Sequence, residues 1–246
     1  MSVEFILLLM IVTFAYMIGA AIGFGSSVIF MTFSVLLFPL PKMVSVVVPL
    51  NLLICIYLVG RHHDGINSRL LLMRILPAVT LGLLAGFAVF RIADTAWMKP
   101  LFGTFVIVLA GFEVRRLVYR NASVRPPMNR HASNFWLLAG GVAQGLWVSG
   151  GPILGYWAGR EIANKHEFRS TLSAVWLILN IFLLIGHLVA GRINSETAIW
   201  SMELAPGVLI GIIFGEMIHS KLPEHGFRII INVILVFAGL AILIKS

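Results

Sequence analysis

Long apolar runs make up most of this chain and decide its fold class. Of the 246 residues, 59% are hydrophobic and only 11% are charged. A soluble domain cannot bury so much apolar surface, whereas a helix of about 20 apolar residues crosses the ~30 Å hydrocarbon core of a bilayer. The runs therefore predict an all-α, polytopic membrane protein. Their approximate bounds are 3–22, 26–40, 43–60, 70–90, 97–118, 133–148, 152–160, 170–190, 196–219 and 226–244.

Two glycine-rich stretches interrupt these runs. The first runs from Gly19 to Ser26 (GAAIGFGS) and the second from Gly145 to Pro152 (GLWVSGGP). Glycine adopts backbone conformations that other residues avoid, and non-helical backbone at membrane depth must line a cavity or be buried in protein. Each stretch precedes a short run, 26–40 or 152–160. We expect each to be a helix break that leads into a half-helix, which enters the membrane and turns back.

The two half-helices predict a site for an anion. Pro152 suits the first turn of one helix, and Ser26 or Ser27 can cap the other, which we expect to reach about Phe38. The free amides and positive dipole ends of both helices would then face one volume. Alternatively, the glycines only let helices pack closely; because the pattern occurs twice, we favour a site. Its predicted members at the breaks are Gly23, Gly25, Ser26, Ser27, Ser149, Gly150, Gly151 and Pro152.

The two halves of the chain follow one pattern. Offsets of about 126 to 129 residues align glycines, prolines and asparagines of the halves in sequential order. We interpret this as a duplicated unit of five segments: residues 1–118, a linker at 119–132, and residues 133–246. Because five is odd, the second copy would be inverted, which gives a bundle of two inverted repeats. The matches are Gly19 with Gly145, Gly25 with Gly151, Asn51 with Asn180, Pro77 with Pro206, Gly82 with Gly211, Gly86 with Gly215, and Ala110-Gly111 with Ala238-Gly239.

The basic residues predict the orientation. With the linker in the cytoplasm, the inverted arrangement places most of the 18 Lys and Arg residues on the cytoplasmic side, as the positive-inside rule requires. Both termini would then lie on the outer face. The net charge of +8 resides in short loops, so it indicates contact with anionic membrane lipid and no nucleic-acid partner.

A few polar residues lie within the apolar runs. Asn51 and Asn180 are near the middle of equivalent segments and would converge beside the breaks, to bind substrate or, alternatively, to tie helices together. Gln144, next to the second break, could line the pathway, as could Trp147. Glu203 and His187 are candidates for proton coupling. We therefore add Asn51, Gln144 and Asn180 to the predicted substrate site.

Familiar catalytic and cofactor motifs are missing from the sequence. It has no HExxH, Walker A, GxSxG or dinucleotide-binding pattern, and its single cysteine, Cys55, excludes a cysteine-based zinc site and an internal disulfide. The intramembrane polar residues are also scattered, which disfavours a membrane-embedded enzyme. We expect no enzymatic activity, no cofactor and no metal site.

The glycine-rich breaks resemble those of a known family. The second break and the helix after it read GLWVSGGPILGYWAG, and with the weaker first copy they resemble the TauE/SafE family of sulfite and organosulfonate exporters. In the first copy Ser26 and Ser27 stand in place of further glycines. The resemblance implies a secondary transporter of a small anion, such as sulfite or a sulfonate, in a bacterial plasma membrane. The residues that match the family motif are Gly19, Gly23, Gly25, Gly145, Gly150, Gly151 and Pro152.

Other functions are compatible with the same sequence. The chain could import the anion, because transport direction follows gradients and coupling. It could also be a membrane scaffold that binds a partner through its basic linker. A homodimer is compatible with either function. Our hypothesis is export by alternating access around a midplane site.

Overall fold

The chain folds into a helical bundle, which confirms the predicted all-α class. The computed structural model describes residues 3–93, 95–118, 128–219 and 224–245, and every element in these ranges is a helix. Five of the described helices are long and apolar enough to cross a membrane. The elements are α1 (Val3–Ile22), α2 (Ser26–Ser34), α3 (Leu40–His62), η1 (His63–Gly65), α4 (Ser68–Leu70), η2 (Leu71–Ile75), α5 (Leu76–Ile92), α6 (Thr95–Val118), α7 (Arg130–Trp147), α8 (Gly151–Glu161), α9 (Lys165–Val189), α10 (Ser195–His219) and α11 (Glu224–Ile244).

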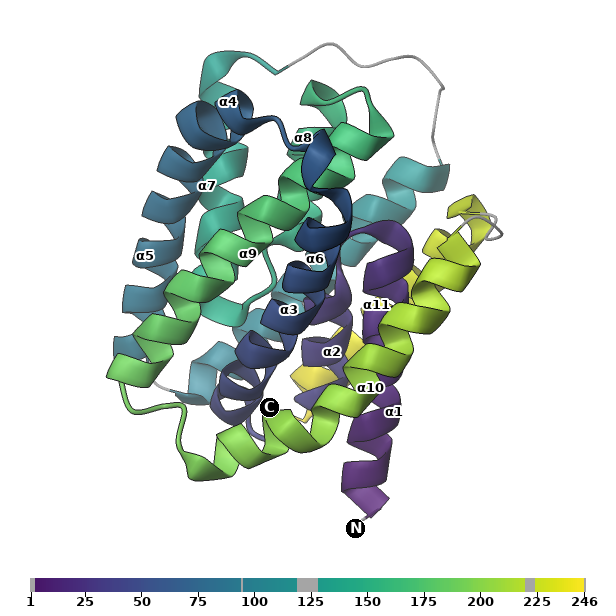
Figure 1. Ribbon diagram of the computed structural model, residues 1–246. Helices are drawn as coiled ribbons and strands as arrows, with labels where there is room; N and C mark the ends of the chain where they lie inside the picture. Colours follow the sequence, from purple (N-terminus) through teal and green to yellow (C-terminus); the bar gives the residue numbers. More distant parts are fainter. Residues whose placement is uncertain (1–2, 94, 119–127, 220–223, 246) are drawn as a thin grey trace.

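The long helices pack in pairs that join the two halves of the chain (Figure 1). Helices α3 and α9 lie side by side through the middle of the bundle. Helix α1 packs on α10, α7 packs on α5, and α6 packs on α11. Each pair thus contains one helix from each half, and the core forms between the halves.

Glycines bring the backbones of α5 and α7 into direct contact. A Cβ atom on Gly86 would overlap the carbonyl oxygen of Val142, and one on Gly145 would overlap the carbonyl oxygen of Leu83. Such close approach is possible only where a helix presents small residues, as is common between membrane helices. These glycines are therefore required by packing.

The contact between α1 and α10 is built in the same way. A Cβ on Gly211 would lie 2.6 Å from the carbonyl oxygen of Thr13, and one on Gly215 would overlap that of Met17. Helices α6 and α11 meet at a further pair of glycines, Gly103 and Gly239. A Cβ on either would lie 3.1 Å from the carbonyl oxygen of the other.

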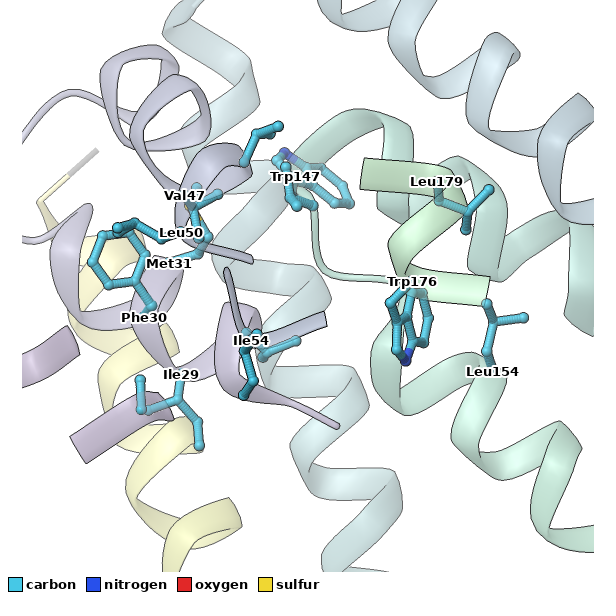
Figure 2. Close-up of a cluster of buried hydrophobic side chains, with 14 of the residues drawn as sticks. Ile29, Phe30, Met31, Val47, Leu50, Ile54, Trp147, Leu154, Trp176 and Leu179 are labelled. Carbon is cyan, nitrogen blue, oxygen red and sulfur yellow. The ribbon is translucent and has the colours of Figure 1, made fainter. Parts of the chain in front are cut away.

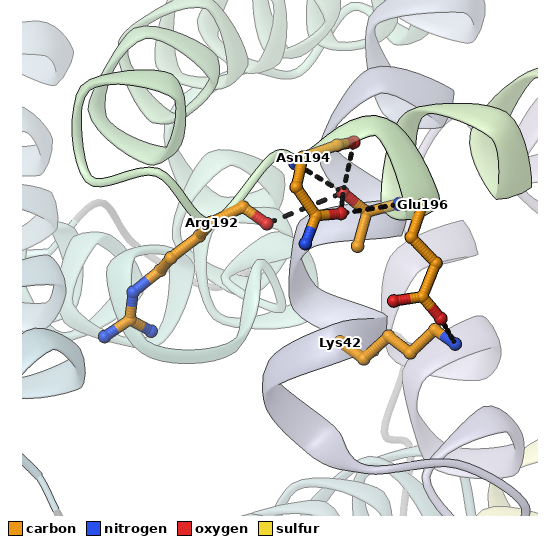
Figure 3. Close-up of polar contacts among 5 residues, drawn as sticks. Lys42, Arg192, Asn194 and Glu196 are labelled. Carbon is orange, nitrogen blue, oxygen red and sulfur yellow. Dashed lines mark hydrogen bonds and ion pairs between the residues drawn. The ribbon is translucent and has the colours of Figure 1, made fainter.

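Polar contacts tie the helix ends at both faces of the bundle. At one end Lys42 of α3 forms an ion pair with Glu196 of α10, with Nζ 2.7 Å from Oε1 (Figure 3). Beside this pair, the side chain of Asn194 caps α10 by accepting from the amide of Thr197. At the other end, Arg74 pairs with Glu161 (2.8 Å). Both ion pairs join the first half of the chain to the second.

The short helices α2 and α8 cannot cross a bilayer. They contain 9 and 11 residues, which correspond to about 14 and 17 Å. Helix α2 ends at Ser34, so the expectation that it reaches Phe38 was wrong. The chain passes from Ser34 into tight turns before Pro39, which precedes α3. The predicted linker falls mostly on residues outside the described ranges, and α7 begins at Arg130.

Candidate functional site

The first break separates α1 from α2. Both Gly23 and Gly25 have φ of +93°, in the left-handed region that L side chains rarely adopt. The amide of Gly23 donates to the carbonyl oxygen of Gly19 (2.8 Å), which ends α1, and Gly25 is the N-cap of α2. No side chain caps this helix, so the expected cap from Ser26 or Ser27 is absent. The first amides of α2 are therefore not used by a capping side chain.

The second break is shaped differently. Val148 has φ of +56°, an unusual conformation for a β-branched residue. The amides of Val148 and Ser149 donate to the carbonyl oxygens of Gln144 (2.9 Å) and Ala143 (3.3 Å), which closes the end of α7. The side-chain Oε1 of Gln144 accepts from the amide of Gly150 (3.0 Å). Gln144 thus holds the break in place, and its NH₂ group remains for a ligand.

The two breaks lie against each other. A Cβ atom on Gly151 would lie 3.5 Å from the amide nitrogen of Gly25 and 4.0 Å from the Cβ of Phe24. Like α2, α8 has no side-chain cap. The N-termini of two short helices from opposite halves of the chain therefore meet, and the N-cap residue of each is a glycine that supplies no capping side chain.

A small cavity lies where the helix N-termini meet. Its volume is about 30 Å³, room for roughly two water-sized groups. Buried apolar side chains, including Ile54 and Trp176, surround this part of the bundle (Figure 2). The cavity is lined by Gly19, Gly23, Phe24, Gly25, Ser26, Ser27, Asn51, Ile54, Cys55, Leu58, Gln144, Gly151, Trp176 and Asn180.

Most of the predicted site residues line this cavity. Ser149, Gly150 and Pro152 do not. The hydroxyl of Ser149 donates to the carbonyl oxygen of Trp147 (2.9 Å), and a Cβ on Gly150 would overlap the carbonyl oxygen of Gly140. Pro152 lines a neighbouring cavity. The predicted residues that the structure brings together are Gly23, Gly25, Ser26, Ser27, Asn51, Gln144, Gly151 and Asn180.

The two asparagines differ in their partners. The hydroxyl of Tyr16 donates to Oδ1 of Asn51 (2.7 Å), so the NH₂ group of Asn51 remains for the cavity. Asn180 donates through Nδ2 to the carbonyl oxygen of Trp176 (2.8 Å) and lies 4.0 Å from the sulfur of Cys55. Both asparagines are almost fully buried. The sequence thus located two buried amides at the cavity, but not the different roles of their donor and acceptor groups.

The cavity wall combines apolar side chains with neutral polar groups. Among the described residues that line it there is no Asp, Glu, Lys, Arg or His. Within the same described ranges, no group of three or more His, Cys, Asp or Glu side chains could hold a metal ion. An anion in this cavity would meet neutral donors and the positive ends of α2 and α8, and no charged side chain of the described lining residues.

A larger cavity, which we call the vestibule, adjoins the central one. Its volume is about 950 Å³, and it is lined by residues of α1, α2, α3, α6, α8, α9, α10 and α11. Phe24 and Gly25 line both cavities. The ring of Phe24 packs against Gly155 of α8 and lies edge-on to Phe168 (centroids 6.2 Å apart). Phe24 is thus the side chain at the boundary between the vestibule and the central cavity.

Arg169 joins three elements beside the first break. Its Nη2 donates to the carbonyl oxygen of Ala20 in α1 (2.9 Å) and to the carboxylate of Glu216 in α10. Its aliphatic stem lies close to Gly23, where a Cβ would be 3.1 Å from Cγ. Arg169 and Glu216 both line the vestibule. Arg169 therefore fixes the end of α1 to α9 and α10.

The two candidate coupling residues lie away from the central cavity. Glu203 is exposed on the outer surface of α10. His187 is fully buried, with its ring against those of Phe87 and Phe90 (centroids 5.1 and 5.7 Å apart). Trp147, the other candidate for the pathway, packs on Phe105 (centroids 5.0 Å apart). None of the three lines the cavity.

Sequence reasoning missed three residues of this region: Phe24, Arg169 and Trp176. Phe24 stands within the first glycine stretch, so its position was a usable signal. Arg169 and Trp176 carried none, because a basic residue at a helix start and a tryptophan in an apolar helix are common in membrane proteins. Only the packing of α9 against the break reveals them.

Comparison with known proteins places the chain among membrane transporters. The model of the family described as sulfite exporter TauE/SafE matches residues 8–242. A curated protein of Comamonas testosteroni, named "Probable inner membrane transporter protein TsaS", is 24% identical over 186 residues. That match covers 73% of this chain and 76% of the relative. No solved structure gives a significant match.

Proposed function

Because the chain belongs to the sulfite exporter TauE/SafE family, whose members are membrane transporters and not enzymes, we propose that it exports a small anion by secondary transport. The proposed substrates are sulfite or an organosulfonate. The proposed binding site is the central cavity between Gly25 and Gly151.

The observation that carries this proposal is the meeting of two helix N-termini, each with a glycine as its N-cap residue, at a cavity whose described lining residues are uncharged. The first-turn amides, which have no partner within their own helix, and the positive dipole ends of α2 and α8 favour a negative ligand. The NH₂ groups of Asn51 and Gln144 add neutral donors. A site without a fixed cation holds an anion loosely enough to release it, which transport requires.

We further propose alternating access between two inverted halves. The helix pairing supports this, because a duplicated and inverted unit would relate the α1–α10 contact to the α7–α5 contact and would map the α6–α11 contact onto itself. The vestibule then represents the access route on one side. Phe24, at its inner end, closes that route in the present conformation.

The proposed orientation places the linker in the cytoplasm of a bacterial cell and both termini outside. The relative from Comamonas testosteroni is named as an inner membrane transporter, which supports the membrane. The C-terminal end of α6 and the N-terminal end of α7, which flank the linker, lie in the upper part of Figure 1, and the N-terminus of the chain lies at the bottom. In this orientation the vestibule, lined by His62, Lys165 and Arg169, opens to the cytoplasm, where an exporter would collect its substrate.

Reconstitution of the purified chain into liposomes tests the proposal. We expect exchange of radiolabelled sulfite across the membrane, and no exchange by Gly151→Leu, whose side chain would fill the space between the breaks. The control is Gly60→Ala, because a Cβ at Gly60 meets nothing within 4 Å. No flux of sulfite or methanesulfonate above protein-free liposomes would contradict transport and favour the scaffold alternative. Release of sulfite from preloaded intact cells would separate export from import.

A further inference from the structure

Trp176 and Asn180 lie one turn apart on α9, and both line the central cavity. Residues four apart on a helix share a face, so their polar groups can act on one ligand. Both side chains are more than nine-tenths buried. Their hydrogen-bonding capacity must therefore be satisfied inside the protein or by what enters the cavity.

The orientation of the Asn180 amide is fixed by its surroundings. Nδ2 donates to the carbonyl oxygen of Trp176 at 2.8 Å, whereas a reversed amide would set two carbonyl oxygens against each other. The buried Oδ1 has no hydrogen-bond partner among the described residues. Oδ1 of Asn180 is therefore a buried acceptor on a residue that lines the cavity.

Trp176 presents the complementary group. Its indole Nε1 can only donate, and it too is buried without a partner in the described part of the chain. A buried polar group without a partner is unfavourable, so each of these atoms favours a ligand that completes its bond. A ligand that satisfies both must carry an acceptor and a donor.

We propose that Trp176 and Asn180 recognise the protonation state of the transported anion, an inference that rests on the proposed function. Nε1 of Trp176 donates to an unprotonated oxygen, and Oδ1 of Asn180 accepts from an O–H group of the same ligand. The ligand class is a monoprotonated oxyanion, of which hydrogen sulfite is an example. A sulfonate has the same charge and a similar head group but no O–H, so it leaves Asn180 unsatisfied.

The coupled proton would then travel on the substrate. One hydrogen sulfite ion that crosses the membrane moves one sulfite dianion and one proton, so no protein side chain needs to be protonated or deprotonated. This agrees with the positions of Glu203 and His187, neither of which lines the cavity.

The groups around the cavity allow this effect to be measured. Its only titratable lining residue among those described is Cys55, and the hydroxyl of Tyr16 lies behind Asn51. The vestibule is lined by further titratable or charged side chains, among them Lys165, His166 and Arg169 of α9, His62 of α3 and Glu216 of α10. Methanesulfonate, which stays a monoanion, controls for titration of all these groups.

The test measures ligand-induced thermal stabilisation of the purified full-length protein by sulfite and by methanesulfonate over a pH series. We expect sulfite affinity to rise as the pH falls through the range in which sulfite takes up its first proton. Methanesulfonate should bind about tenfold more weakly, the effect of one hydrogen bond to a charged ligand, with no such pH dependence. Sulfite affinity that does not depend on pH would mean that water satisfies both groups, and would overturn the proposal.

Two substitutions sharpen the test. Asn180→Leu should lower sulfite affinity about tenfold, to that of methanesulfonate, and Trp176→Phe should weaken both anions. Matched controls are Asn134→Leu and Trp97→Phe, because both residues are exposed.

Equal weakening of the binding of both anions by Asn180→Leu would also overturn the proposal while leaving anion transport intact. If neither anion binds at any pH, the proposed function itself fails; the wild-type series decides this even if a variant misfolds.

Discussion

The ring of Phe24 lies directly over Gly155, where a Cβ atom would be 3.1 Å from two ring carbons. This contact holds the aromatic side chain between the vestibule and the central cavity. Helix α8 therefore supports a residue of the opposite half of the chain at the point where substrate would enter.

Phe24→Ala should open the route from the vestibule to the cavity. Cys55, the single cysteine of the chain, lines the cavity and reports on access to it. We expect a small cationic methanethiosulfonate reagent to label Cys55 several-fold faster in this variant, because the barrier is removed. The control is Phe182→Ala, an exposed position on α9. Equal labelling rates in the variant and the wild type would show that Phe24 is not the barrier.

Gly151→Ala should separate folding from binding. The added Cβ would lie 3.5 Å from the amide nitrogen of Gly25, an ordinary contact, and Gly151 has no positive φ. The protein should therefore fold normally. The methyl group nevertheless occupies the space where an anion would meet the amides, so sulfite affinity should fall about 10- to 100-fold. Unchanged affinity, measured by thermal stabilisation, would place the anion elsewhere.

Gly86→Ala and Gly215→Ala should both destabilise the protein. In each case the new methyl group meets a backbone carbonyl oxygen, of Val142 or Met17, which cannot move aside as a side chain would. Overpacking of this kind costs about 1–3 kcal/mol. Unfolding in detergent should show a loss of this size for both variants, and none for Gly111→Ala, where nothing lies within 4 Å. A large difference between the two variants would count against equivalent roles for the helix pairs.

Arg169→Gln should cost more stability than Glu216→Gln. The arginine also donates to Ala20, so its loss frees the end of α1, whereas without Glu216 it keeps that bond. We expect a loss of about 1–3 kcal/mol for Arg169→Gln, because a buried acceptor loses its donor. The double variant should be less destabilised than the sum of the two, since both substitutions break one ion pair. Additive losses would show that the two residues act independently.

Glu203→Gln should leave proton-dependent transport unchanged. The carboxylate is exposed on α10 and does not line the central cavity. Sulfite flux measured with and without a pH gradient should respond equally in the variant and the wild type. A loss of the response to the gradient, with flux retained, would restore Glu203 as a coupling residue.

Much of this architecture could be predicted from the sequence because its signals are strong and local. Apolar runs predicted the helices, and glycine clusters predicted both breaks. The positions of Asn51 and Asn180 placed two polar residues beside those breaks, where the structure has the central cavity.

The remaining features depend on tertiary contacts. Glycine carries the same signal whether it supplies a positive φ, as at Gly25, or a close contact, as at Gly150, so the sequence could not separate the two roles. The sequence also could not show that the hydroxyl of Ser149 donates to the carbonyl oxygen of Trp147 at the end of α7, or that Trp176 lines the central cavity. These depend on how α7, α8 and α9 pack.

The glycine contacts also limit how this molecule can move. Where α1 meets α10 and α5 meets α7, the glycines bring the two backbones into direct contact. No layer of side chains lies between the backbones at these points to rearrange. We expect each pair to shift as a rigid body. We expect changes in access to arise between α3 and α9 instead, because side chains of both helices line the central cavity. A small rotation of one helix against the other would reshape the space around the substrate.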